Sequence, residues 1–278
     1  MGTASWSPTG SPDGACVAFI SDRSGAPRVW VRFSRHGAAT MPATGQDPVV
    51  AVSWSRDGDW LAAMVAPGGE ARTEVWVMRP DGSDRRQVAG FGSRSATFGA
   101  WTHGAVSWLP VAESGGEWSD GASYLLDPAT GRRRPVAHGG LLHTLDASAD
   151  HRFVLVRRGR RTARWVEVID LADGSTRVPV PRADVGSTDL AHFADGGRTV
   201  LLRTDVGRDL AALVATPTAG DDIRVVASRS DAELERFAIS GDGRTAVLLW
   251  NVHGGRSALS LLDVASGDQR TLDAVPGD

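Results

Sequence analysis

The stretch Ser11-Pro12-Asp13-Gly14, followed by Cys16-Val17-Ala18-Phe19-Ile20-Ser21, decides the fold of this chain, because its turn-then-strand pattern recurs along the sequence. Proline holds φ at about −65°, aspartate accepts hydrogen bonds from nearby backbone and glycine accepts a positive φ, so the chain turns sharply. The segment 16–21 is apolar at successive positions, which is typical of a strand covered on both faces.

The same turn signal, or its remnant, is found at six places spaced about 44 to 47 residues apart. The six anchors are Asp13-Gly14, Asp57-Gly58, His103-Gly104, Asp150-His151, Gly196-Gly197 and Asp242-Gly243. A period of this length is typical of a propeller blade. We therefore predict an all-β chain, a β-propeller of about six four-stranded blades. These six belong either to a ring of their own or to one of seven or eight blades.

We predict one domain over residues 1–278, since the repeat covers the whole chain. The predicted blades are approximately 1–48, 49–94, 95–141, 142–186, 187–232 and 233–278. Within the first two blades, further strands are predicted at 28–33, 61–65, 74–78 and 86–89. Tryptophans at equivalent places, Trp6 with Trp54 and Trp30 with Trp76, are predicted to pack as wedges between blades.

Composition excludes several classes of function. The net charge of −3 gives no reason to expect nucleic acid or an anionic membrane as the main partner. Lysine is absent, because all 30 basic residues are arginine, so lysine-dependent phosphate loops, Schiff bases and pyridoxal phosphate attachment are excluded. Cys16 is the single cysteine, which rules out an intramolecular disulfide and a thiolate metal cluster. It is expected to pack beside Val17 and Phe19. Residues 1–10 lack the features of a secretory signal, and no apolar run is long enough to span a membrane, so a cytoplasmic location is expected.

The histidines do not form a motif that binds metal. The seven are His36, His103, His138, His143, His151, His192 and His253. His103 and His151 replace turn residues, and a metal bound by His138 and His143 would require the chain between them to fold back. Histidines from several blades could still meet in the axial channel of a propeller, which the sequence leaves open.

Arginines gather at two places. Arg157, Arg158, Arg160, Arg161 and Arg164 are predicted at a hairpin tip between strands 153–156 and 165–169, and Arg132, Arg133 and Arg134 follow Gly131. We interpret both groups as solvated loops. The alternative is a contact for an acidic partner surface or a substrate carboxylate. Glu113 and Glu117, with Trp118, are predicted to lie in a surface loop.

The chain resembles TolB/PD40-type propellers in three strings: Ser5-Trp6-Ser7-Pro8, then Ser11-Pro12-Asp13-Gly14 with Val17-Ala18-Phe19-Ile20-Ser21-Asp22-Arg23, then Val29-Trp30-Val31. As a whole it is similar to the N-terminal propeller of prolyl oligopeptidase-family (S9) serine peptidases, of the acylaminoacyl peptidase and dipeptidyl aminopeptidase types. In that family dipeptidyl peptidases use propeller glutamates to hold a substrate's α-amino group, but the match at Glu113 and Glu117 is too weak to assign a site.

The resemblance implies a ring that covers an α/β-hydrolase domain in cis and admits peptides or small acylated substrates. The serine elbow of such a hydrolase, Gly-x-Ser-x-Gly, is missing from this sequence. The nearest strings, around Ser123 and Ser257, lack the last glycine and are interpreted as turn serines. Residues 269–272 are predicted as a last outer strand, and 275–278 as a connection to a further domain.

We therefore expect a non-catalytic propeller that gates access to a serine peptidase domain absent from this chain. The parent protein would be a hydrolase, whereas this chain alone would have no catalytic, metal-binding or cofactor-binding residues, and no substrate-binding residue is assigned. Two alternatives stay open: a free-standing TolB-like interaction propeller, and a propeller lactonase or lyase with a channel metal.

Overall fold

The computed structural model describes residues 3–33, 37–42, 45–103, 106–115 and 120–272. In this part the chain is almost entirely antiparallel β-structure, interrupted by short 3-10 turns at Pro67–Gly69 and Asp195–Gly197. Neither of these helical segments approaches the length or apolar character needed to cross a membrane.

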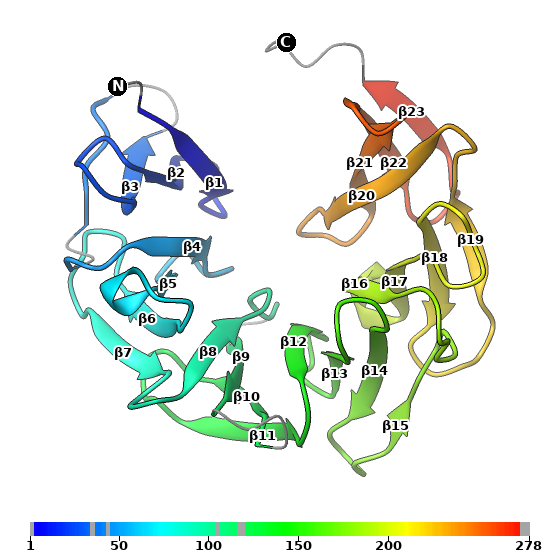
Figure 1. Ribbon diagram of the computed structural model, residues 1–278, viewed down its shortest axis with the longest axis horizontal. Coiled ribbons are helices and arrows are strands. Elements are labelled where there is room, and N and C mark those ends of the chain that lie inside the picture. Colours follow the sequence, from blue (N-terminus) through cyan, green and yellow to red (C-terminus); the bar gives the residue numbers. More distant parts are fainter. Residues whose placement is uncertain (1–2, 34–36, 43–44, 104–105, 116–119, 273–278) are drawn as a thin grey trace. The chain divides into compact units, whose positions relative to one another are not determined.

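Each repeat folds into one sheet whose strands pair in chain order (Figure 1). The strands are, sheet by sheet, β1 Ser5–Gly10, β2 Cys16–Ser21 and β3 Arg28–Phe33; β4 Val49–Trp54, β5 Leu61–Val65, β6 Glu74–Met78 and β7 Arg86–Ala89; β8 Ser95–Phe98, β9 Leu109–Ser114, β10 Ala122–Leu126 and β11 Arg133–His138; β12 Leu142–Ala147, β13 Phe153–Arg158, β14 Trp165–Asp170 and β15 Thr176–Arg177; β16 Thr188–Ala194, β17 Thr199–Thr204, β18 Ala212–Pro217 and β19 Arg224–Ala227; β20 Ala232–Ile239, β21 Thr245–Val252, β22 Arg256–Asp263 and β23 Gln269–Leu272.

These sheets confirm the predicted fold class, an all-β propeller of six blades. Among the described residues the first blade has three paired strands, and Thr40 forms a bridge with Val31 of β3 where the fourth would begin. The strands predicted at 16–21, 28–33, 61–65, 74–78, 86–89 and 269–272 are present at those bounds. Residues 275–278, predicted to lead to a further domain, lie outside the described part.

Four of the predicted turns share one hydrogen-bond network, which explains why the pattern recurs. In each, a serine Oγ donates to the aspartate two residues later at 2.5–2.6 Å and accepts from the N–H five residues later at 2.8–3.0 Å. The aspartate also accepts the N–H two residues after it. The pairs are Ser11 with Asp13, Ser55 with Asp57, Ser148 with Asp150, and Ser240 with Asp242. His151 takes the glycine position in the third pair, with φ at 56°.

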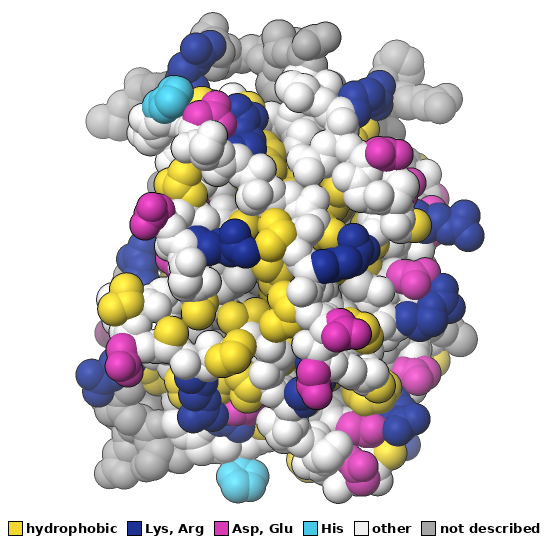
Figure 2. Space-filling view, turned by 90° about the vertical axis from the view of Figure 1, so that its right-hand side faces the viewer, with side chains coloured by type: hydrophobic (Ala, Val, Ile, Leu, Met, Phe, Trp, Pro, Cys, Tyr) yellow, Lys and Arg dark blue, Asp and Glu magenta, His cyan; other side chains and the backbone are white. Residues whose placement is uncertain are grey.

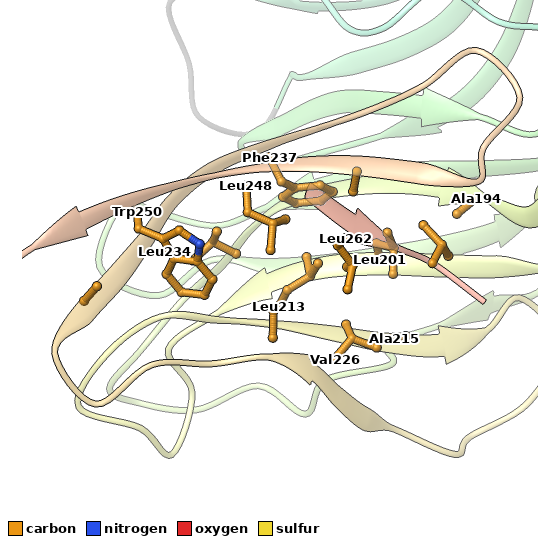
Figure 3. Packing of buried hydrophobic residues seen from close by; sticks show 14 residues of the cluster. Ala194, Leu201, Leu213, Ala215, Val226, Leu234, Phe237, Leu248, Trp250 and Leu262 are labelled. Carbon is orange, nitrogen blue, oxygen red and sulfur yellow. The ribbon is translucent and has the colours of Figure 1, made fainter. Parts of the chain in front are cut away.

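The chain divides into two compact units, residues 1–144 and 145–278. The first contains a cluster between the first two blades around Ile20 and Leu61, and another between the second and third around Trp101 and Leu109. The second unit contains a cluster around Leu155 and one around Trp250. Figure 3 shows the last of these, in which Trp250, Leu248 and Phe237 pack beside Leu213 and Leu201. These clusters explain the strands that are apolar on both faces, because each blade packs against a neighbouring blade.

The tryptophan prediction is confirmed for Trp54, which is buried against the cluster of the first two blades. It is wrong for Trp6, which is 37% exposed on β1. Trp30 and Trp76 are half-buried, and each has an arginine guanidinium over its ring: Arg23 at 4.7 Å from the centroid and Arg85 at 4.1 Å. Trp76 also packs against the cluster of the first two blades, as predicted, so its ring is covered by apolar side chains and by an arginine.

The first strand of several blades contains a β-bulge. Successive pairs skip one residue at Val50 in β4, at Asp189 in β16 and at Glu235 in β20. A bulge bends the strand and changes the direction of its side chains. In β16 it places the Asp189 carboxylate beside Arg203, the residue opposite Leu190.

Candidate functional site

The predicted arginine hairpin tip is divided between strand and loop. Arg157 and Arg158 are the last residues of β13, Arg160 and Arg161 are exposed in the loop, and Arg164 is half-buried directly before β14. The solvated-loop interpretation is therefore right for the exposed pair and wrong for Arg157 and Arg158, because β13 extends two residues further than the sequence suggested. Neighbouring strand residues point to opposite faces, so these two arginines have different surroundings.

Arg158 belongs to a closed group of ion pairs. Its Nε lies 2.6 Å from Oε2 of the buried Glu167 on β14, and the indole Nε1 of Trp165 donates to the other carboxylate oxygen at 3.1 Å. Arg182 approaches the same carboxylate at 3.6 Å and stacks on the Trp165 ring. Because every member has a partner, this group is a structural feature of the hairpin.

Arg157 lies on the other face of β13, the face that packs against the next blade. Its neighbours two positions back and across the strand, Leu155 and Val166, belong to the cluster shared with β16 and β17. Its guanidinium donates one hydrogen bond, from Nη1 to the backbone oxygen of Asp189, at 3.3 Å. Burial, with the nearby positive charge of Arg164, lowers the pKa of Arg157 to about 10 although Asp189 acts in the opposite direction.

A second arginine occupies the equivalent place one blade later. Arg203 is the penultimate residue of β17, as Arg157 is of β13. It binds the carboxylates of Asp189 at 2.8 Å and Glu233 at 2.9 Å, and its Nε donates to the backbone oxygen of Leu234. Arg203 therefore connects the start of β16 to the start of β20 and uses one oxygen of each carboxylate.

Arg164 is the third arginine near the start of β16. Its backbone N–H donates to the Oγ of the buried Ser187, and its backbone oxygen accepts the N–H of Thr188, so the loop is held against the start of β16. Its Nε is buried and has no hydrogen-bond partner within the described part of the chain. Among those same residues no carboxylate oxygen lies within 4 Å of Arg157 or Arg164.

This arrangement can hold an anion. The backbones of Arg157 and Arg164 are held by strand and loop, their side chains are partly shielded from water, and neither guanidinium is neutralised by an ion pair within the described residues. The sequence located Arg157 and Arg164 but missed Asp189, Arg203 and Glu233, which are distant along the chain. The repeat contains the missing signal, since Arg157 and Arg203 are penultimate residues of corresponding strands, as is Asn251 of β21.

The histidines lie apart from this site. His151 and His253 occupy turns with positive φ, His143 shares a hydrogen bond of 2.8 Å with Thr97, and His192 contacts the buried Asp146 at 3.3 Å. His138 ends β11, and His103 lies at the edge of the described residues, whereas His36 and Gly104 fall outside them. No three histidine, cysteine or acidic side chains gather to hold a metal ion in the part of the chain that the structure describes.

Glu113 is not in a surface loop, which corrects the prediction. It lies in β9, is 7% exposed, and accepts the N–H of Gly90 at 2.8 Å and an Arg133 hydrogen bond at 3.3 Å. Arg133 also donates to the backbone oxygen of Val88, so the Arg132–Arg134 group is not simply a solvated loop. Glu113 therefore joins the third blade to the end of the second. Glu117 and Trp118 lie outside the described residues.

The serines and the cysteine are also in strands. Ser123 is buried in β10, 2.7 Å from the hydroxyl of Thr144, and Ser257 is exposed in β22, so neither is the turn serine that was predicted. Cys16 is half-buried in β2 against the first core cluster, as expected. Burial raises the pKa of the Cys16 thiol, which makes it a poor nucleophile.

No protein-family model and no curated protein matches this sequence. Solved structures do match. The chain is similar to an oligogalacturonate lyase from Vibrio parahaemolyticus, with a TM-score of 0.73 at 12% identity over 98% of this chain and 80% of the lyase. It is similar to a prolyl endopeptidase, with a TM-score of 0.73 at 13% identity over 99% of this chain and 43% of that one. The chain is also similar to TolB from Acinetobacter baumannii, with a TM-score of 0.61 at 12% identity over 92% of this chain and 63% of TolB. These likenesses support the propeller fold and place peptidase propellers among its neighbours.

Proposed function

We propose that this chain is the propeller of a prolyl oligopeptidase-family serine peptidase, and that it selects substrates by controlling access to a hydrolase domain in the same polypeptide. The observation that carries the proposal is the coverage: 99% of this chain aligns with 43% of a prolyl endopeptidase, and the rest of that chain has no counterpart here. The chain thus spans less than half of that neighbour.

The residues of this chain fit a role in access and not in bond cleavage. The sequence lacks the Gly-x-Ser-x-Gly elbow, and the structure explains the serines of the two similar strings as strand residues. In the proposed protein, acyl transfer belongs to serine, histidine and aspartate residues beyond this chain. The propeller admits short flexible peptides or acyl-peptides, and it excludes folded proteins by size. A cytoplasmic location is part of the proposal.

The reading frame that follows codon 278 tests this proposal directly. We expect a segment that encodes a strand, a Gly-x-Ser-x-Gly elbow and a helix, followed by aspartate and histidine in hydrolase order. A frame that ends without a hydrolase domain would contradict the proposal and favour the free-standing TolB-like interaction propeller.

A lyase or lactonase propeller is the second candidate, because the chain covers 80% of the oligogalacturonate lyase, a larger share than of the peptidase. The described residues do not supply the three-ligand group that a channel metal needs. Elemental analysis of the purified chain separates this candidate from the first, together with an assay for unsaturated product from oligogalacturonate in added manganese, the metal in complex with another solved oligogalacturonate lyase. Metal-dependent turnover would overturn the peptidase proposal.

A further inference from the structure

We propose that Arg157 and Arg164 form a binding site for a single carboxylate group, supplied by the C-terminus or by an acidic side chain of a small peptide-like ligand. The proposal goes beyond the proposed function, because it rests on contacts within the second unit alone. It would hold equally for a lyase or an interaction propeller.

The first step concerns position. Arg157 donates from the end of β13 to the backbone oxygen of Asp189 at the start of β16, and Arg164 lies in the loop held to that start by Ser187 and Thr188. β13 and β14 both contact β16 (Figure 1), so both arginines lie where one blade joins the next, and the charge of Arg164 acts on Arg157. Their backbones are fixed by the β13–β14 ladder and by these loop hydrogen bonds. A site on fixed backbone loses little conformational entropy when a ligand binds.

The second step concerns charge. Asp189, whose negative charge acts on Arg157, binds Arg203 through its carboxylate and accepts from Arg157 through its backbone oxygen. Glu233 likewise binds Arg203, and Asp205 accepts the backbone N–H of Ser187. Each of these carboxylates has another partner, while the described residues give the guanidinium of Arg157 one weak acceptor and the Nε of Arg164 none.

The third step concerns the cost of this arrangement and what would relieve it. A partly buried cation beside another cation is unfavourable, and the lowered pKa of Arg157 is consistent with that. An anion bound between the two guanidiniums would neutralise both and supply the missing acceptors. A carboxylate fits best, because its planar pair of oxygens matches the planar donors of a guanidinium.

Titration of the purified chain, followed by NMR through its arginine Nε–Hε resonances, tests the site. The probes are N-acetyl-Ala-Ala, which has a free C-terminal carboxylate, N-acetyl-Glu-amide, which has only a side-chain carboxylate, and N-acetyl-Ala-Ala-amide, which has neither. We expect saturable shifts at Arg157 and Arg164 with one or both carboxylate probes and none with the amide. The probe that binds identifies the source of the carboxylate.

Variants provide the controls. Arg164→Gln and Arg157→Met should each weaken binding by about tenfold or more, whereas Arg161→Gln, an equal change of charge at an exposed position of the same loop, should change it by less than about twofold. Circular dichroism checks the fold of each variant. If Arg157→Met does not fold, the loss of binding is measured with Arg164→Gln alone. Equal binding of the amide, no saturable shift with either carboxylate, or unchanged binding in both variants would overturn the proposal.

Discussion

Arg157 shows how the register of one strand decides the environment of a charge. Were β13 to end at Val156, its arginines would extend into water. Instead the strand continues to Arg158, and alternation places Arg157 against the core of the next blade and Arg158 beside Glu167. Arg158 has an ion-pair partner, whereas Arg157 has only a backbone carbonyl oxygen as acceptor. That difference is what makes Arg157 a candidate for function, because a stabilising role would have been better served by a carboxylate.

Replacement of Arg157 by methionine should therefore cost little stability. The side-chain methylenes keep their contacts, while the desolvation of an unpaired charge is removed, so we expect the free energy of unfolding to change by less than about 1 kcal/mol or to rise. Urea unfolding at neutral pH measures it. A loss of several kcal/mol would show that the charge is satisfied in the native state and would weaken the case for an anion site.

Asp150 gives a pH-dependent prediction. A hydrogen bond from Ser148 is the main cause that lowers the pKa of Asp150, while partial burial acts against it and the N–H of Arg152 adds to the lowering. Because the folded pKa lies below the unfolded value of 3.8, the ionised carboxylate stabilises the fold at neutral pH, and this contribution is lost as the pH falls through the folded pKa.

Asp150→Asn should accordingly lower stability at neutral pH by an amount that stays constant down to about pH 5 and shrinks below about pH 4. Urea unfolding of both proteins across this range measures the difference. A difference that did not change with pH would mean that hydrogen-bond geometry, and not charge, accounts for the effect of the substitution.

At the scale of the elements, links between blades come from side chains that bind the neighbouring backbone. Glu113 on β9 accepts the N–H of Gly90 just after β7, and Thr9 on β1 accepts the N–H of Trp54 on β4 at 3.3 Å. Asp146 on β12 makes the same kind of link to Phe193 on β16 at 3.0 Å. Such bonds fix the register of one blade against the next, which apolar packing alone does not specify.

Glu113→Ala should destabilise the protein by about 2–4 kcal/mol, because it leaves the buried N–H of Gly90 unpaired and removes the carboxylate that binds Arg133. Glu113→Gln keeps an acceptor and should cost less. Glu70→Ala removes an exposed glutamate from the same unit and serves as the control, with a change below about 0.5 kcal/mol. Equal effects at positions 70 and 113 would contradict the structural role of Glu113.

The fold could be predicted because turn chemistry is local. The Ser-x-Asp network lies within a few residues and repeats, so its sequence signal is direct. The position of Glu113 could not be predicted, since its burial depends on Gly90 and Arg133 from other strands. Of the proposed anion site, the sequence showed the cluster with Arg157 and Arg164, which we interpreted as a solvated loop, but not Arg203, which comes from the next blade. Trp6 was mispredicted because equivalence in sequence does not ensure an equivalent neighbour.

At the scale of the whole molecule, a propeller presents many loops on one scaffold, and fold alone does not decide among a peptidase gate, a lyase and an interaction module. Charged and apolar side chains are interspersed on the face in Figure 2, where no single kind of side chain dominates. This face therefore indicates no class of partner, and the coverage of the prolyl endopeptidase remains the main support for the proposed function.

The most direct test is to label the native protein that contains this chain with a fluorophosphonate probe for active serines, isolate it with an antibody against the propeller, and measure its mass and the labelled peptide. The account predicts a polypeptide more than twice the mass of this 29.3 kDa chain, with the label on a serine outside residues 1–278. An unlabelled protein of about 29 kDa, or a label within residues 1–278, would contradict it.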